Sequence, residues 1–576
     1  MNINKLWCGI AAFLLAAAPA LADDWFIEAR YQNPAQVGAI AGEFQHLIID
    51  ENRQTIRVDT DDAGIRRLED AGMSVTVDMA ATAQMRVSDL AMVKGPGIES
   101  IPGYACYRTV EETYSTIDDL VSSHPALASA EDIGPTWQRT QNAAQGYQMR
   151  SLRITNLATA ANDPDRPKMV SLGSIHAREY TPAELLTRMA EWLVNSYGTD
   201  PQATWLVDHV DFRFVLEANP DGRKRAETGI SWRKNINSVD GFCAGTPSAS
   251  SQPGIDLNRN FPFHWSTVLN GSSGTKCSLT FRGPVAGSEP ETQNLVGYVA
   301  GIPGTDGRYS GGVLQDRRAD GTAFPAPNDY AGLFFDIHSY SKLVLWPWGD
   351  TSTPSGNAEA FTSIGRRIAY LNNYKPQQAI GLYATDGTTN DTFYGLLGAP
   401  SFTIELGNQF FEPCAAFEDT ILPANLAALK YAARIAWRPY QLPLGPDVTS
   451  IDPIIRVDQG TPVTLNAKID ELRYNNSNGT QPTFPITAAN AYVDHAPWDA
   501  GAIAVAMRAS DGSFDTKTEF VSCSIDTSGL AVGRHLVYVQ GVNSQTGGGR
   551  AGAPNAIFLD VLPVGDSIYF DGADSP

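Results

Sequence analysis

The chain has 576 residues, of which 43% are hydrophobic, and carries a formal net charge of −21 with a pI near 4.8. This length exceeds what one hydrophobic core usually supports and predicts three units. The negative charge argues against nucleic acid or an anionic membrane surface as a partner.

Residues 1–22 have the pattern of a secretory signal peptide. Lys5 gives a charged start, residues 6–18 form an apolar core, and residues 20–22 are a small-residue cleavage site. No later stretch is long and apolar enough to span a membrane. We therefore expect a soluble mature chain that is secreted or periplasmic, a compartment that favours disulfides among the remaining cysteines.

Residues 23–100 alternate strand-like runs with helical patterns and predict a small α+β module followed by a linker. Arg86 and Lys94 lie in the linker, and either is a candidate processing site for a protease. The strand-like runs are at 25–31, 55–58 and 74–77, and the helical patterns are at 34–44 and 61–71.

A His-x-x-Glu sequence, His176 and Glu179, follows an apolar strand-like run at 169–175. A helix is predicted directly after it, with Thr181 as N-cap and Glu184 as its capping-box partner. The His and Glu therefore lie in the turn between a strand and a helix, where open α/β sheets place ligands.

Two further buried runs end on residues with metal-binding or acid–base chemistry. Residues 333–337 lead to His338, and residues 401–404 lead to Glu405. Zinc catalytic sites use three protein ligands and leave a fourth position to water. The His-x-x-Glu pair and His338 fill that ligand count, and Glu405 is spare.

These residues resemble those of zinc metallocarboxypeptidases of the pancreatic carboxypeptidase A and B type, over about residues 104–440. In that family the second histidine opens a His-Ser-Tyr-Ser segment and the catalytic glutamate follows a Ser-Phe-Thr-x run, as His338 and Glu405 do here. The resemblance implies a mixed eight-stranded α/β sheet flanked by helices, with one Zn²⁺ held by His176, Glu179 and His338. It also implies hydrolysis of the C-terminal residue of peptides or proteins with a free C-terminus, with Glu405 as general base toward a water at the zinc.

Other residues receive roles from the same resemblance. Arg233, in a Ser-Trp-Arg-Lys motif, matches the arginine that polarises the scissile carbonyl and stabilises the oxyanion. Asn258 and Arg259 match the pair that grips the substrate's free carboxylate, for which an arginine fork is well suited. Asp256 is expected to accept a hydrogen bond from the first zinc histidine.

Three residues are assigned near the substrate by position. Tyr383 matches a mobile tyrosine that closes over the C-terminal residue, and Arg178 matches an arginine near the substrate backbone; the alternatives are a loop tyrosine and a surface ion-pair partner. Asn390 falls in the floor of the side-chain pocket, where family members carry an apolar residue or an aspartate. Because an amide has no net charge, we expect a broad or apolar preference unless Asp386 or Asp391 points inward.

The cysteines are expected to form two disulfides. Cys243 and Cys277 bracket the loop that carries the Asn-Arg pair, as a disulfide does in some family members. Cys106 and Cys414 lie at the two ends of the catalytic unit and form the second expected pair. Cys523 is left over, either free or paired differently.

The flanking regions have their own predictions. The position of residues 23–100 resembles the family's pro-segment, which covers the active site until an activating protease removes it; a permanent folding or docking module is the alternative. Pro439, Pro443 and Pro446 mark a linker. Residues 447–576 then show short alternating runs separated by turn residues, which predict an immunoglobulin-like β-sandwich.

Two rival functions remain open on sequence grounds. One is a metallopeptidase of the same fold that trims cell-wall peptides, for which Asn258, Arg259 and Tyr383 would matter less. The other is a non-enzymatic adhesive protein with a degenerate peptidase domain. The joint presence of the three ligands with Glu405 and Arg233 argues against this second rival, and the carboxylate-gripping pair favours ordinary peptides.

Overall fold

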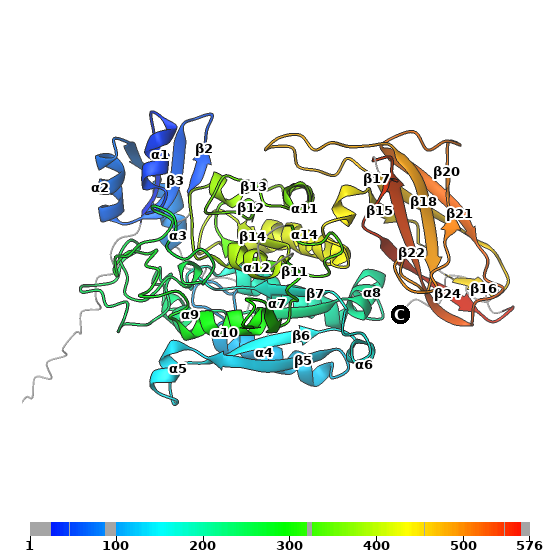
Figure 1. The fold of residues 1–576 in the computed structure, drawn as a ribbon, viewed down its shortest axis with the longest axis horizontal. Coiled ribbons are helices and arrows are strands. Elements are labelled where there is room, and N and C mark those ends of the chain that lie inside the picture. The colour runs from blue at the N-terminus through cyan, green and yellow to red at the C-terminus, as the bar shows by residue number, and fades with distance from the viewer. Residues whose placement is uncertain are drawn as a thin grey trace, which may run out of the picture.

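A computed structural model of the protein describes residues 25–44, 47–86, 100–318, 325–453, 456–545 and 548–565. The chain forms an N-terminal module, a central α/β domain and a C-terminal pair of β-sheets, and the central domain lies between the other two (Figure 1). The expected signal peptide and Lys94 of the expected linker lie outside the described residues.

The central domain is built on a sheet with eight strands in the described residues. Its four middle strands, β14, β11, β7 and β8, run parallel to one another, so their carboxyl ends meet at one edge. The order across the sheet is β13 (Lys375–Gln378), β12 (Leu343–Trp346), β14 (Ser401–Leu406), β11 (Leu333–Ser339), β7 (Lys168–Leu172), β8 (Asp211–Val215), β6 (Gln148–Ile154) and β5 (Ala128–Pro135).

Helices cover both faces of this sheet. One face is covered by a row of contacting helices, α4 (Val110–Ser123), α7 (Thr181–Asn195), α14 (Leu422–Ile435) and α11 (Ala358–Asn372). On the other face, α12 (Thr389–Leu397) packs Phe393 against Phe334 of β11, and α10 (Pro290–Val299) places Tyr298 beside Arg213 of β8. The predicted mixed eight-stranded α/β fold is thus confirmed.

Shorter elements complete the central domain. They are α5 (Trp137–Gln141), α6 (Leu157–Ala160), α8 (Pro201–His209), α9 (Pro220–Ala226), the 3-10 turn η1 (Leu257–Arg259), β9 (Gly301–Pro303), β10 (Tyr309–Gly311), the 3-10 turn η2 (Ala379–Gly381), α13 (Cys414–Ala416), the π-helical turn η3 (Phe417–Ile421) and the 3-10 turn η4 (Leu442–Leu444).

The start of α7 differs from its prediction. Thr181 is the first helical residue rather than the N-cap, which is Tyr180, and the Thr181 hydroxyl makes no hydrogen bond with any described residue. Glu184 is engaged elsewhere, because Arg108 Nη1 lies 2.7 Å and Arg188 Nε 2.6 Å from its Oε1. The strand-to-helix turn is therefore present, and the predicted capping box is wrong.

The N-terminal module has a four-stranded sheet in the order β2-β3-β1-β4. Ile27, Ile56 and Leu68 are among the residues of its own apolar core. Every predicted strand and helix of this segment occurs, and β2 and α3 are additional. The elements are β1 (Trp25–Arg30), α1 (Pro34–Ile40), β2 (Ile48–Asp50), β3 (Thr55–Thr60), α2 (Asp62–Asp70), β4 (Ser74–Val77) and α3 (Met79–Arg86).

The C-terminal region is a β-sandwich. One sheet has the order β15-β17-β21-β20 and the other β16-β24-β22-β18-β19, with β23 beside β22. Leu465 and Ile469 of β17 share one apolar core with Val537 and Val539 of β22. The strands are β15 (Asp447–Ile451), β16 (Arg456–Asp458), β17 (Val463–Asp470), β18 (Ile486–Val493), β19 (Val505–Ala506), β20 (Arg508–Ala509), β21 (Thr518–Ile525), β22 (Gly533–Asn543), β23 (Arg550–Ala551) and β24 (Asn555–Leu562).

The connection between the central domain and the sandwich is a packed joint. Leu442 and Leu444 are buried in it. Arg367 of α11 donates from Nε to the Pro443 carbonyl at 2.9 Å, and its Nη1 lies 2.9 Å from Asp447 Oδ2. The proline pattern predicted a linker here, but buried hydrogen bonds and an ion pair tie this segment to α11.

Both expected disulfides are present. Cys106 pairs with Cys414 and Cys243 pairs with Cys277. Of the cysteines in the described residues, Cys523 is the one left free. Among the described helices, none has both the length and the apolar character that crossing a bilayer requires.

Candidate active site

The predicted site residues gather at the carboxyl edge of the parallel strands. His338 of β11 and Glu405 of β14 are register partners on adjacent strands. Because paired residues of neighbouring strands point to the same face, their side chains lie side by side. His176 and Glu179 occupy the turn from β7 to α7, in which Ser174 adopts a left-handed φ of 54°.

His176, Glu179 and His338 form one compact cluster. His176 Nδ1 lies 2.8 Å from Glu179 Oε1, and His338 Nδ1 lies 3.1 Å both from His176 Nδ1 and from Glu179 Oε2. All three side chains are buried. In the part of the chain that the structure describes, no other group of acidic, histidine or cysteine side chains is placed to hold a metal. Two imidazole nitrogens with one carboxylate are a donor set that catalytic zinc uses.

A carboxylate stands behind each histidine. Asp256 Oδ1 lies 3.1 Å from His176 Nε2, and Asp336 Oδ2 lies 2.9 Å from His338 Nε2. These contacts occupy Nε2 of both rings and leave Nδ1 facing the centre of the cluster, as a zinc site requires. Burial disfavours the charged form of Asp256, but Arg233 and His176 still hold its pKa below the ordinary value.

Asp336 was not among the predicted site residues. It lies two positions before His338 in a strand that is otherwise apolar, and therefore on the same face as that histidine. The Thr389 hydroxyl donates to its Oδ2 at 2.5 Å, so a buried hydrogen bond orients the carboxylate. A single acidic residue two positions before a candidate ligand, in a buried strand, is the sequence feature that could have identified Asp336 as a partner of His338.

Replacing Asp336 with asparagine is expected to weaken zinc binding by about 10- to 100-fold, because the carboxylate no longer orients His338. Chelator competition on the purified chain measures this affinity without any activity assay. Asp391→Asn is a matched control, since Asp391 is a buried carboxylate of α12 whose Oδ2 accepts a hydrogen bond from the Gly349 amide at 2.8 Å. Equal zinc affinity in Asp336→Asn and the unsubstituted chain would contradict this role.

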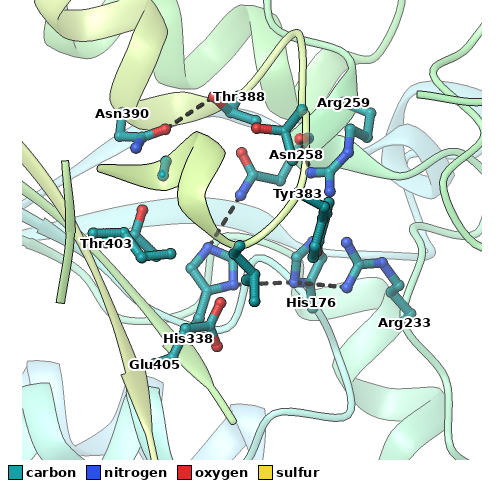
Figure 2. A pocket seen from close by; sticks show the side chains of 14 residues that line it. His176, Arg233, Asn258, Arg259, His338, Tyr383, Thr388, Asn390, Thr403 and Glu405 are labelled. Carbon is teal, nitrogen blue, oxygen red and sulfur yellow. Dashed lines mark hydrogen bonds between the residues drawn. The ribbon is translucent and has the colours of Figure 1, made fainter. Parts of the chain in front are cut away.

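A cavity of about 50 Å³ adjoins the cluster (Figure 2). It brings together residues that are far apart in the sequence, including the acid Glu405 and the cations Arg233 and Arg259. Its walls are His176, Arg233, Asn258, Arg259, His338, Leu345, Ala379, Leu382, Tyr383, Thr385, Thr388, Asn390, Thr403 and Glu405.

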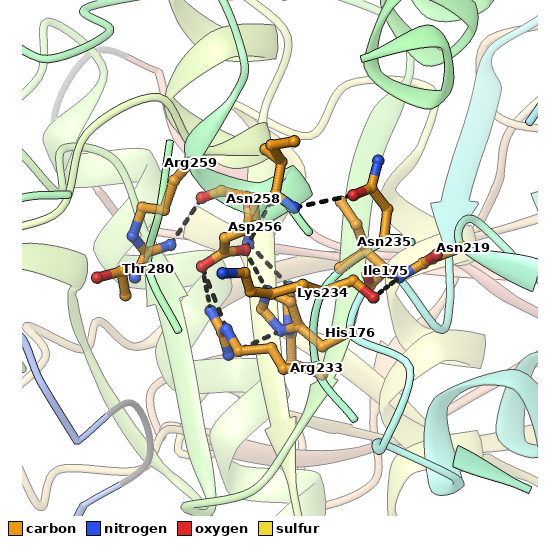
Figure 3. Close-up of polar contacts among 12 residues, drawn as sticks. Ile175, His176, Asn219, Arg233, Lys234, Asn235, Asp256, Asn258, Arg259 and Thr280 are labelled. Atoms are coloured by element: carbon orange, nitrogen blue, oxygen red, sulfur yellow. Dashed lines mark hydrogen bonds and ion pairs between the residues drawn. The ribbon is translucent and has the colours of Figure 1, made fainter. Parts of the chain in front are cut away.

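The segment that carries Arg233, Asn258 and Arg259 is held rigidly (Figure 3). Arg233 Nη2 donates to Asp256 Oδ2 at 2.8 Å. Lys234 is buried, and its ammonium group donates to the carbonyls of Gln252, Lys276 and Ser278 at 2.7, 2.8 and 2.7 Å. The disulfide between Cys243 and Cys277 closes the same loop. The loop is therefore anchored on both sides of the Asn-Arg pair.

Three predicted substrate residues have different surroundings. Arg178 is buried, donates to Ser231 Oγ at 3.2 Å and lies 3.8 Å from the ring centre of Phe410, so it is not a surface ion-pair partner. Tyr383 lines the cavity and packs against the core of the N-terminal module. Asn390 lies at the first turn of α12 and also lines the cavity.

Asp386 and Asp391 are not among the cavity's walls. Asp386 Oδ2 accepts a hydrogen bond from the Val268 amide at 3.0 Å, and Asp391 Oδ2 accepts one from the Gly349 amide at 2.8 Å. Burial raises the pKa of Asp391 to about 7. Neither aspartate therefore gives the cavity the negative charge that would select a basic side chain.

The N-terminal module contacts residues next to the cluster. Tyr340, two residues after His338, donates to Asp59 Oδ1 at 2.8 Å and accepts from the Asp59 amide at 3.1 Å. Phe26, Tyr340 and Phe410 form a small apolar cluster between the two parts. The module therefore packs against residues that lie beside the cavity.

Comparison with known proteins matches residues 113–426 to the zinc carboxypeptidase family. The chain belongs to this family. A zinc carboxypeptidase of Saccharothrix mutabilis subsp. capreolus is 29% identical over 336 residues, which cover 57% of this chain and 68% of that protein. Mouse carboxypeptidase A1 is 27% identical over 352 residues, which cover 58% of this chain and 72% of that protein.

The fold agrees with this membership. The crystal structure of carboxypeptidase A from Helicoverpa armigera matches with a TM-score of 0.55 at 20% identity, covering 73% of this chain and 98% of that one. As a zinc carboxypeptidase, the protein is a zinc-dependent peptide hydrolase. The donor set and the two carboxylates behind it fit that metal.

Proposed function

We propose that the protein is an exported carboxypeptidase that removes the last residue from peptides with a free C-terminus. The observation that carries this proposal is the placement of Glu405, Arg233 and Arg259 around one cavity beside the His-Glu-His cluster (Figure 2). An acid–base group, a donor for an oxyanion and a cation for a carboxylate are the three elements this reaction needs.

The side chains around the cavity have different roles in the proposed reaction. His176, Glu179 and His338 would hold zinc, which when bound would supply Lewis acidity beside the cavity. The Glu405 carboxylate takes a proton from the attacking water and returns it to the leaving amine. The Arg233 guanidinium donates hydrogen bonds to the carbonyl oxygen as it gains negative charge, and Asp256 fixes its orientation.

Asn258 and Arg259 give the reaction its exopeptidase character. Both line the cavity, and Thr389 N donates to Asn258 Oδ1 at 2.8 Å, which holds that amide in place. An arginine fork pairs with the two oxygens of a terminal carboxylate. This pair favours peptides with a free C-terminus over the cell-wall alternative.

Matched peptides that differ only in a free or amidated C-terminus test the proposed function. Mass spectrometry should show loss of single C-terminal residues from the free-acid peptides alone. Cleavage at internal bonds, or equal cleavage of the amidated peptides, would contradict it.

Export is supported by the signal-like residues 1–22 and by the two disulfides, which persist in oxidising compartments. Residues 23–100 act as a pro-segment in this proposal, and cleavage at Arg86 or Lys94 by an activating protease would release the module. Its contacts with Tyr340, Tyr383 and Phe410 support this role.

Replacing Asp59 with alanine is expected to raise the activity of the uncleaved chain several-fold, because the module loses the hydrogen bond that the Tyr340 hydroxyl donates to the Asp59 carboxylate. Initial rates on one free-acid peptide, measured before and after limited trypsin treatment, give the comparison. Asp70→Ala, on an exposed position of α2, is the matched control and should leave the rate of the uncleaved chain unchanged. Identical rates for the intact and trypsin-treated chains would instead indicate a permanent module.

A further inference from the structure

The floor of the cavity has a defined hydrogen-bonding pattern. Asn390 Oδ1 accepts from the Thr388 hydroxyl at 2.9 Å and from the Asp391 amide at 2.9 Å. A backbone N–H can only donate, so the atom that faces it must be the amide oxygen. The orientation of the Asn390 side chain is thereby fixed, and its nitrogen is turned the other way.

The Asn390 nitrogen and the Thr403 hydroxyl are left to the cavity. Neither makes a hydrogen bond with any described residue, although the two side chains are only 5% and 7% exposed. Figure 2 shows that they point toward one another. Because a polar group that is buried without a partner is costly, a ligand that covers these two groups binds better when it forms hydrogen bonds with them.

Aliphatic side chains form another part of the cavity wall. Leu345, Ala379 and Leu382 form an aliphatic wall, and they pack together in one small cluster. Of the described residues, the charged ones lining the cavity are Arg233, Arg259 and Glu405, which the proposed reaction already uses. A matching side chain has an aliphatic stem and a neutral head with both a donor and an acceptor.

We propose that the cavity selects a C-terminal residue with a carboxamide side chain, glutamine or asparagine. The ligand's carbonyl oxygen accepts from Asn390 Nδ2, while its NH₂ group donates to the Thr403 hydroxyl oxygen. This proposal rests on the proposed carboxypeptidase function and specifies its substrate class. It replaces the broad or apolar preference that residue type alone predicted.

Other side chains fit this arrangement less well. An apolar residue leaves the Asn390 nitrogen and the Thr403 hydroxyl buried without partners, and sites built to hydrogen-bond discriminate strongly against such ligands. A glutamate side chain places a carboxylate in a region without a cation to pair with it. A lysine side chain meets no carboxylate there, since Asp386 and Asp391 bond elsewhere.

The test is a set of peptides that differ only in a C-terminal Gln, Asn, Met, Glu or Lys. They are digested by the full chain, with trypsin treatment first if the uncleaved chain is silent, and kcat/KM is measured for each. Methionine is close to glutamine in length and shape, so the Gln/Met ratio reports the hydrogen bonds. We expect this ratio to be about ten or more, with Glu and Lys also below Gln.

Two variants locate the cause of the preference. Asn390→Leu and Thr403→Val remove one hydrogen-bonding group each at similar volume, and each is expected to lower the Gln/Met ratio about tenfold while methionine release continues. Asn195→Leu, on an exposed position at the end of α7, should leave the ratio unchanged.

Three results would overturn the proposal. A Gln/Met ratio at or below one, a ratio unaffected by Asn390→Leu, or a preference for Glu over Gln would each refute carboxamide selection while leaving the carboxypeptidase function standing. If no free-acid peptide is shortened from its C-terminus, the proposed function itself fails, and carboxamide selection fails with it.

Discussion

Replacing Glu405 with glutamine is expected to lower kcat by about a thousandfold or more, because the variant loses the carboxylate that we propose as the general base. Glu405 is the register partner of His338 and lies in the cavity wall, but it is not one of the three clustered ligands. Zinc content should therefore remain one ion per chain. Steady-state kinetics on one free-acid peptide and metal analysis of the same preparation provide the two readings.

Glu131→Gln serves as the control for this variant. Glu131 lies on the edge strand β5, where it forms a half-exposed ion pair with Arg213 far from the cavity. Its activity should equal that of the unsubstituted chain. Retained activity in Glu405→Gln would refute the assigned mechanism, and loss of zinc together with activity would make Glu405 a ligand instead.

Replacing Arg259 with glutamine is expected to lower kcat/KM for free-acid peptides by about two to three orders of magnitude, the usual cost of removing one partner of a buried charge pair. Arg259 lines the cavity, is 3% exposed, and donates from Nη1 to the Asn258 carbonyl at 2.7 Å. The ratio of free-acid to amidated cleavage should fall toward one, because the variant no longer distinguishes the two C-termini.

Arg225→Gln, on an exposed position of α9, removes a charge of the same kind elsewhere and should change neither rate. Thermal unfolding of both variants shows whether the substitution has damaged the fold. If Arg259→Gln keeps its full preference for free-acid peptides, another group must bind the substrate's carboxylate.

The main site residues could be predicted because they belong to short sequence motifs. His176 and Glu179 are three residues apart in one turn, and His338 and Glu405 each lie near the end of a buried strand. Parallel strands bring such ends to one edge, so the chain order of strands and helices was enough to place them together. Asp256 was predicted for a similar reason, since it lies in the same short motif as Asn258 and Arg259.

Features that depend on distant contacts could not be predicted. Glu184 lost its expected capping role to Arg108, which lies 76 residues earlier in the chain. The proline-rich connection is buried because Arg367 of α11 bonds to Pro443 and Asp447. In both cases the local sequence pattern predicted one structure, but contacts with an arginine that is distant in the sequence produced a different one.

Asn390 was predicted only in part: its position in the pocket was predicted, but the direction of its side-chain amide was not. Its position in the pocket followed from the resemblance, but its hydrogen-bonding character depends on the Thr388 hydroxyl and the Asp391 amide that hold its oxygen. Residue type alone therefore favoured a broad or apolar preference. The geometry instead leaves a donor and a hydroxyl to the substrate.

Reconstitution of the metal-free chain with zinc tests the central claim most directly. The metal-free protein should not shorten a free-acid peptide, and activity should rise in proportion to added zinc and reach its plateau at one equivalent per chain. His338→Ala should bind no stoichiometric zinc and remain inactive. Full exopeptidase activity without metal, or a plateau only at two equivalents, would contradict a single zinc held by His176, Glu179 and His338.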